Sequence, residues 1–148
     1  MYLADWVIKQ EVEESKLIDP FKEENLTPNG YDLSIEKIGV FGRKEWVIYP
    51  HTDFIILTEE TINMPQHLLG NLWIKTKWAR KGIKLHAGVV DAGFKGKLNL
   101  MCSSSCNTLT RFKKGDKFAQ IVFAQVYKPE KLYAKRSGHY QNQKDVIK

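Results

Sequence analysis

The sequence predicts a mainly β protein, a β-sandwich or jelly roll in which short strands surround one core. The main evidence is a series of short apolar segments separated by turn signals at Asn29-Gly30, Pro50, Pro65, Gly93 and Gly115. Little of the chain has helical periodicity, and no internal repeat or low-complexity linker divides it. The length of 148 residues fits a single domain with one core.

One short helix is expected at the N-terminus. Apolar side chains recur at a mostly helical spacing across residues 3–16, from Leu3 to Val12, with glutamates between them. Pro20 follows and ends the pattern, because proline lacks the amide hydrogen that a helix needs.

The remainder of the chain is expected to form strands and a terminal arm. The expected strands cover residues 46–49, 54–57, 70–75, 84–90, 97–102 and 117–127, with a further short one at 131–134. We therefore expect residues 1–134 to form the β domain. Residues 135–148 are polar and rich in Lys and Gln, which predicts a flexible C-terminal arm that becomes ordered when something binds it.

Composition limits the class of protein and of partner. The net charge of +6 indicates an anionic partner, either nucleic acid or a polyphosphate. Cys102 and Cys106 lack metal-finger spacing and a second pair, so we expect reduced thiols. No apolar run is long enough for a membrane span, and no secretory leader is recognisable. The expected location is the cytoplasm, or the host cytoplasm if the gene is viral.

Residues 87–96, Ala-Gly-Val-Val-Asp-Ala-Gly-Phe-Lys-Gly, are the strongest functional signal. The segment reads as strand, tight turn and strand, a β-hairpin that carries Asp91 at its turn. Glycines 93 and 96 allow the backbone to approach a flat ligand closely. We interpret this arrangement as one that binds a nucleobase while a carboxylate positions a water; a solvated hairpin with a surface aspartate is the alternative from this segment alone.

The segment resembles the third motif of the trimeric dUTPase and dCTP deaminase superfamily. Further matches follow in the family's order: Asn29-Gly30-Tyr31-Asp32-Leu33 resembles the first motif, residues 75–80 occupy the place of the phosphate segment, residues 115–121 resemble the fourth motif, and residues 135–143 resemble the C-terminal arm in its deaminase-like Tyr-Gln-x-Gln version. The resemblance covers residues 17–144. It implies a dUTPase-like β-clip, which is a distorted β-barrel or jelly roll.

The resemblance implies how a nucleoside would bind. Asp91 would be the catalytic base that positions the water attacking the α-phosphate of dUTP. Phe94 would lie under the deoxyribose and leave no room for a 2′-hydroxyl. Backbone groups of the segment, at Gly88, Val89, Val90 and Gly96, would read the uracil. Two residues of the arm, Tyr140 and Gln143, would close over the nucleotide.

The resemblance also implies how the triphosphate would be held. The phosphate-binding residues would be Lys75, Thr76, Lys77, Arg80, Gln120 and Arg136. This chain departs from its relatives here: Lys75 replaces the usual arginine, Thr76 and Lys77 stand where two serines are common, and Trp78 replaces a leucine. Mg²⁺ would bind mainly to the phosphates, and Asp32 would contact it through water.

The reaction type depends on position 101. Deaminases of this superfamily carry a glutamate here, in a segment resembling Gly-Lys-x-x-Leu-Glu, whereas this chain has Met101. Removal of the cytosine amino group needs a proton-transferring side chain, and methionine is unable to serve. His86 is a spare acid-base candidate, although a strand or surface role suits it as well. We therefore expect hydrolysis of dUTP to dUMP and diphosphate.

Alternatives remain open at this point. The first is a dCTP deaminase or a bifunctional dCTP deaminase and dUTPase; the second is a non-catalytic, dUTPase-like nucleotide-binding or regulatory protein, which the altered 75–78 segment suggests. The positive charge alone would also fit nucleic acid, but no recognisable binding module supports that interpretation. The resemblance further implies a homotrimer whose sites lie between subunits, with the arm of one subunit covering a site that others build.

Overall fold

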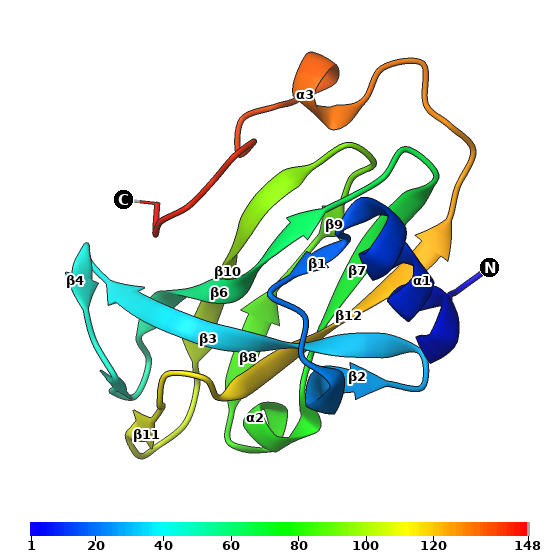
Figure 1. The fold of residues 1–148 in the computed structure, drawn as a ribbon. Helices are drawn as coiled ribbons and strands as arrows, with labels where there is room; N and C mark the ends of the chain where they lie inside the picture. The colour runs from blue at the N-terminus through cyan, green and yellow to red at the C-terminus, as the bar shows by residue number, and fades with distance from the viewer. Residues whose placement is uncertain (148) are drawn as a thin grey trace.

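The computed structural model describes residues 1–147 and consists mainly of one strongly curled β-sheet (Figure 1). The elements in chain order are α1 (Asp5–Ser15), β1 (Ile18–Asp19), the 3-10 helix η1 (Glu23–Asn25), β2 (Leu26–Thr27), β3 (Gly30–Val40), β4 (Arg43–Lys44), β5 (Val47–Ile48), β6 (Asp53–Asn63), β7 (Leu68–Ile74), α2 (Thr76–Arg80), β8 (Ile83–His86), β9 (Val89–Val90), β10 (Lys95–Ser104), β11 (Thr110–Arg111), β12 (Lys117–Gln125) and α3 (Tyr133–Arg136). The predicted mainly β fold with an N-terminal helix is confirmed.

The order of the strands explains why the sheet curls. The main path runs β8-β10-β6-β3-β12-β7-β9, so β8 and β9 are its two edges. Only Ala87 and Gly88 separate these two strands in the sequence. Because two residues span a few ångströms, the edges of the sheet must approach each other. The result is the distorted barrel that the sequence predicts.

The core lies inside this curl and is filled by alternate residues of the long strands. In β10, Gly96, Leu98, Leu100 and Cys102 are buried while their neighbours are more exposed, as a half-buried strand requires. Each fully buried leucine or isoleucine contributes roughly 1.5–3 kcal/mol to folding. Cys102 and Cys106 are not joined by a disulfide.

The N-terminal helix is shorter than the apolar pattern. It ends at Ser15 because Lys16 adopts a left-handed conformation with φ of 54°, and its N–H donates to the carbonyl of Val12. The chain then buries Leu17 and Ile18 against the sheet. Pro20 therefore does not end the helix, because it follows β1 and lies five residues after Ser15.

Several sequence-based assignments need correction. The expected strand at 84–90 is two strands, β8 and β9, and the expected hairpin is not one: β9 pairs with β7, while β10 pairs with β6 and β8. The expected strand at 131–134 is absent, because residues 131–132 belong to a loop and residues 133–134 begin α3. Residues 76–80, which no expected strand covers, form helix α2. The long strand β3 escaped prediction because its buried face carries polar Asp32 and Ser34.

Among residues 1–147, no helix is both long enough and apolar enough to cross a membrane.

Candidate active site

Asp91 lies where the chain crosses from β9 to β10, within residues 87–96, which we call the Asp91 segment. Val90 is buried, whereas Asp91 is exposed. Two backbone hydrogen bonds anchor the turn to Met64: the N–H of Gly93 donates to the Met64 carbonyl at 3.0 Å, and the Met64 N–H donates to the carbonyl of Phe94 at 2.8 Å. The carboxylate therefore projects into solvent from a backbone that is fixed to the body of the protein.

A cleft of about 390 Å³ opens beside Asp91. The Asp91 segment forms one wall and the C-terminal arm the other. The cleft contains six of the predicted site residues, namely Gly88, Val89, Val90, Asp91, Phe94 and Tyr140. Its volume falls within the range typical of small-ligand sites. The structure thus brings together the predicted base, the sugar-binding ring and part of the predicted lid.

The arm lies along its own chain's Asp91 segment. The N–H of Asn142 donates to the carbonyl of Lys95 at 2.6 Å, and the N–H of Lys97 donates to the carbonyl of Gln143 at 2.8 Å. Gly96, at φ of 154°, makes this approach possible, because a Cβ there would lie 2.8 Å from the Gln143 nitrogen. The Gln143 amide donates to the Lys97 carbonyl at 3.3 Å, and this side chain borders a separate hollow instead of the main cleft.

Asp91 also borders a second cleft, of about 270 Å³. Two cationic side chains, Lys131 and Arg136, line it together with Tyr133 and Ser137. Arg136 is therefore placed near the carboxylate, as a residue of the arm that binds phosphate should be. Asp91 therefore borders both clefts, and the smaller one contains the two cationic side chains.

The remaining predicted residues gather on the outer face of the sheet. Gln120 of β12 is paired in register with Asp32 of β3 on one side and with Trp73 of β7 on the other. The ammonium of Lys75 donates to Asp32 Oδ2 at 2.7 Å. The Gln120 amide donates to the hydroxyl of Thr27 at 2.7 Å. Asp32, Lys75 and Gln120 thus form a second cluster.

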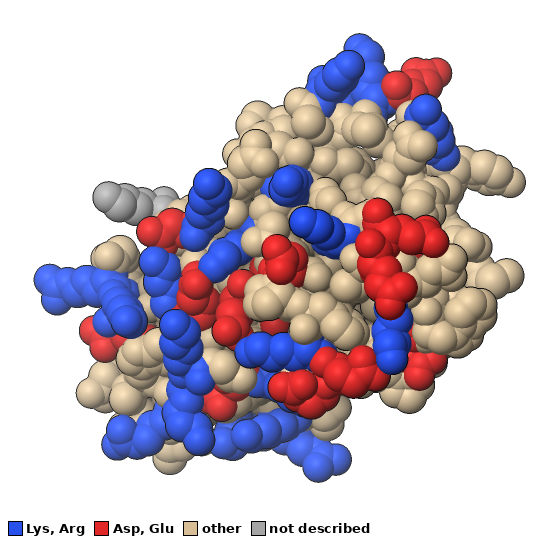
Figure 2. Space-filling model, in the orientation of Figure 1, with Lys and Arg blue, Asp and Glu red and all other residues tan. Residues whose placement is uncertain are grey.

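Helix α2 follows Lys75 and extends this cluster with exposed cations. Thr76, Lys77 and Arg80 are all exposed. Trp78 faces inward, where its ring packs 4.5 Å from that of Phe112 and its indole N–H donates to the Lys117 carbonyl at 2.8 Å. The tryptophan therefore anchors α2, so its bulk does not block the basic face. Figure 2 shows Lys and Arg gathered along the lower edge of the molecule, where α2 and β11 lie in Figure 1.

The two groups of predicted residues lie at opposite ends of the sheet. Within the described part of the chain, no residue of α2, β3 or β12 lines either cleft beside Asp91. Figure 1 shows α2 at the lower end and α3 with the arm at the upper end. One chain by itself therefore does not bring the Lys75–Arg80 segment to Asp91.

Met101 lies on the outward face of β10 beside the arm and is 43% exposed. It borders a hollow of about 180 Å³ together with Tyr140 and Gln143. Its partner on β8 is His86, whose Nε2 lies 3.0 Å from the Ser103 hydroxyl. His86 is thus bound to a strand neighbour and lies at the edge of the main cleft. The hollow is therefore bordered by a thioether, at the position where the resemblance implies a glutamate in deaminases.

Asp32 has the features of a residue that contacts a metal through water. Its side chain is only 7% exposed, one oxygen binds Lys75, and Oδ1 is buried without a hydrogen-bond partner. Such an oxygen can accept from a metal-bound water, which Mg²⁺ retains readily. Across residues 1–147, no group of three or more His, Cys, Asp or Glu side chains could hold a metal directly. The donor set fits a Mg²⁺ ion carried mainly by phosphate oxygens.

Sequence reasoning missed several residues near the site. Tyr133, Ser137 and His139 line the main cleft, although the first was assigned to a strand. It also missed Glu60, a carboxyl that is 1% exposed and accepts the N–H of Ser34 on both oxygens. Burial raises the pKa of Glu60 to about 7. Ser137 and His139 lie within the arm motif of residues 135–143 but were given no role of their own, whereas Tyr133 and Glu60 belong to no motif and act through contacts distant in sequence.

The fold and the clefts agree with comparisons to known proteins. Residues 35–126 match the model of the dCTP deaminase-like family, so the chain belongs to this family, within the dUTPase and dCTP deaminase superfamily that its motifs predict. A dCTP deaminase of Pyrococcus horikoshii is 35% identical, over 99% of this chain and 96% of its own length. A protein of Sulfolobus islandicus rod-shaped virus 1, named "Probable deoxyuridine 5'-triphosphate nucleotidohydrolase", is 32% identical over 99% of this chain and 96% of its own.

Solved structures show the same fold. The dCTP deaminase of Agrobacterium tumefaciens superposes with a TM-score of 0.70 at 16% identity, covering 85% of this chain and 48% of that one. A dUTPase of Staphylococcus bacteriophage 80alpha, solved with dUpNHpp, gives a TM-score of 0.59 at 17% identity, covering 76% of this chain and 91% of that one. The dUTPase of phage phi11 of S. aureus, whose structure describes a structural Mg(II) ion, gives 0.59 at 19% identity over 76% of this chain and 86% of its own. The relatives are enzymes of two kinds, deaminases and diphosphatases.

Proposed function

We propose that the protein hydrolyses dUTP to dUMP and diphosphate. The observation that carries this proposal is that one chain combines an exposed, firmly anchored Asp91 with a methionine at position 101. The carboxylate lines a cleft of about 390 Å³, and the position on β10 that corresponds to the deaminase glutamate holds a side chain that is unable to transfer a proton. Hydrolysis needs only the first group, whereas deamination needs one at the second position.

The reaction follows from the position of Asp91 between the two clefts. The nucleoside would lie in the larger cleft, with its base against the backbone of Gly88 to Val90 and its sugar over Phe94. Asp91 would accept a proton from a water as the water oxygen attacks the α-phosphorus. The bond from that phosphorus to the bridging oxygen breaks, and diphosphate leaves with its charge balanced by cationic side chains.

Magnesium fits this scheme as a partner of the substrate. Bound to the triphosphate, it would neutralise phosphate charge as the leaving group departs. Asp32 would accept a hydrogen bond from one of its waters, and Gln120 and Lys75 lie beside that carboxylate. This role matches the buried, unpartnered Oδ1 atom.

The predicted site residues are divided between the two ends of the sheet, and this division supports self-association. The Lys75–Arg80 segment would have to come from a neighbouring subunit to meet Asp91 and the substrate. We propose a homotrimer, as the resemblance implies, with each site shared between subunits. The arm differs from that expectation: because it lies on its own chain's Asp91 segment, one chain would supply Asp91 together with its own arm, and the neighbour would supply α2, Asp32 and Gln120.

A dCTP deaminase is the second candidate, because most of the similar curated proteins carry that name. The experiment that separates the two is to incubate the protein and Mg²⁺ with dUTP, dCTP, dTTP and UTP, and to identify the products by mass. We expect dUMP and diphosphate from dUTP, with no ammonia from dCTP. Ammonia release from dCTP would establish the deaminase, and tight dUTP binding without any product would establish a non-catalytic binding protein.

A further inference from the structure

Tyr133, the first residue of α3, connects the Asp91 segment with the arm. Its N–H donates to the carbonyl of Ala92 at 3.0 Å. Leu132 and Tyr133 sit directly on Gly93, where a Cβ would lie 2.7 Å from the Leu132 Cβ and 3.2 Å from the Tyr133 nitrogen. The start of α3 is therefore fixed to the turn that carries Asp91, and Tyr133 borders both clefts.

The ring of Tyr133 packs edge-on against Phe94. The two ring centroids are 5.4 Å apart and the planes make an angle of 72°. Phe94 is only 6% exposed, so Tyr133 limits how far that ring can move. An aromatic pair in this geometry gains attraction beyond its buried area. The Phe94 ring can exclude a 2′-hydroxyl only if it stays in place, and the contact with Tyr133 keeps it there.

The hydroxyl of the same side chain holds the arm. It accepts the backbone N–H of Tyr140 at 3.0 Å. Tyr140 lines the cleft from the opposite wall. One residue thus contacts the ring expected to select the sugar and the segment expected to close over the nucleotide.

We propose that Tyr133 is a positioning residue that sets sugar selectivity through its ring and closes the arm through its hydroxyl. The inference rests on the proposed binding of dUTP in the larger cleft. Sugar selectivity is assigned to the ring and arm closure to the hydroxyl, so two substitutions separate these two roles. Tyr133→Phe removes only the hydroxyl, and Tyr133→Leu removes the hydroxyl and the aromatic ring.

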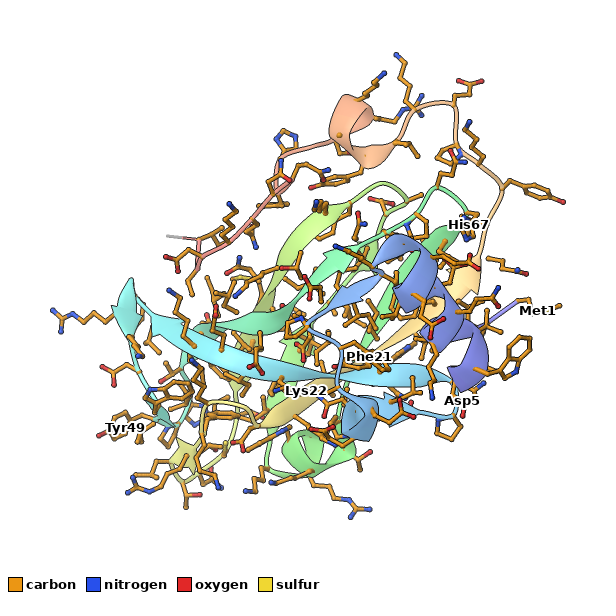
Figure 3. The ribbon with its side chains drawn as sticks, viewed as in Figure 1. Met1, Asp5, Phe21, Lys22, Tyr49 and His67 are labelled. Atoms are coloured by element: carbon orange, nitrogen blue, oxygen red, sulfur yellow. The ribbon has the colours of Figure 1, made fainter. Side chains whose placement is uncertain are left out.

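The first measurement is backbone hydrogen exchange of residues 138–143 in the nucleotide-free protein. Both variants should exchange faster at Tyr140, by about fivefold, the effect of losing one neutral hydrogen bond. Tyr49→Phe is the matched control, because Tyr49 is 64% exposed and lies at the end of the molecule away from the arm (Figure 3). Unchanged exchange in both variants would remove the hydroxyl from this role.

The second measurement is the ratio of dissociation constants for the α,β-imido analogues of UTP and dUTP. The ratio should stay as in the wild type for Tyr133→Phe and fall by roughly two- to tenfold for Tyr133→Leu, the range of an aromatic pair contribution. Equal ratios in the wild type and both variants would overturn the selectivity part. Circular dichroism confirms that each variant is folded.

The two measurements keep this inference distinct from the proposed function. Wild-type protein that binds the dUTP analogue but releases no diphosphate from dUTP contradicts hydrolysis and leaves both tests of Tyr133 valid. Wild-type protein that fails to bind the analogue overturns the selectivity part along with the proposed function, while hydrogen exchange still decides the link to the arm.

Discussion

Asp91 and Asp32 are two aspartates whose surroundings suit different tasks. Asp91 is exposed beside two clefts and is free to meet a substrate and its water. Asp32 is almost fully buried, with Lys75 on one oxygen and no partner on the other. A general base must reach the reacting water, which only the first position allows. The second suits the orientation of a hydrated cation.

The Lys75–Asp32 pair should contribute to stability as well as to binding. In Lys75→Met the buried carboxylate loses its only charged partner, so we expect a loss of about 2 kcal/mol in the free energy of unfolding, below the cost of a fully buried pair because Lys75 is partly exposed. Urea denaturation measures it. The double variant Lys75→Met with Asp32→Asn should recover much of this loss, and strictly additive effects would contradict the coupling.

Glu60 should make the stability of the protein depend on pH. Burial raises its pKa from 4.5 to about 7 in the folded state, so the folded protein binds this proton more tightly than the unfolded chain. Its contribution is full below pH 4.5 and is lost as the pH rises to about 7, on the order of 3 kcal/mol in total. Denaturation between pH 4 and 8 should show this decline in the wild type and a flatter profile in Glu60→Gln. The same decline in the variant would assign it to another group.

The secondary-structure elements differ in how far the sequence predicts them. β10 and β12 alternate buried and exposed residues, so period-two reasoning finds them. β3 does not, because six successive residues from Gly30 are buried, among them Asp32, which binds Lys75, and Ser34, whose hydroxyl accepts the Asn25 amide. The pairing of β9 with β7 is equally hidden, since it depends on the curl of the whole sheet.

The residues of the candidate site also differ in how far the sequence predicts them. Asp91, Phe94 and Tyr140 were identifiable because each belongs to a short motif, and the structure places them around one cleft. Tyr133 belongs to no motif, and its importance comes from contacts with Phe94 and Tyr140. The basic residues of α2 were identifiable as cations, but the sequence does not show that they lie far from Asp91 in the same chain.

The docking of the arm depends on the absence of a side chain at Gly96. Gly96→Ala would place a Cβ 2.8 Å from the Gln143 nitrogen at a φ of 154°, so the arm should detach from the Asp91 segment. We expect limited proteolysis after residue 136 to become several-fold faster. Gly88→Ala is the control, because no atom lies within 4 Å of its Cβ position. An arm equally protected in both variants would contradict this account of docking.

At the level of the whole molecule, the division of the site between the two ends of the sheet makes a shared active site testable. Arg80→Ala should lose a phosphate contact and Asp91→Asn should lose the base, so each variant alone should be nearly inactive. In trimers assembled from equal amounts of both, about a quarter of the shared sites should receive an intact Arg80 and an intact Asp91 from different chains. Co-expressed variants should therefore recover about that fraction of activity, and no recovery would place the complete site within one chain.

Diphosphate release from dUTP by Asp91→Asn, measured beside the wild type in Mg²⁺, tests the proposed mechanism most directly. The amide is similar in size to the carboxylate but does not accept the proton of the attacking water. We expect turnover to fall by at least about a hundredfold, while the dissociation constant of the α,β-imido dUTP analogue stays within a few-fold of the wild-type value. Turnover close to wild type in Asp91→Asn would contradict the assignment of Asp91 as the base.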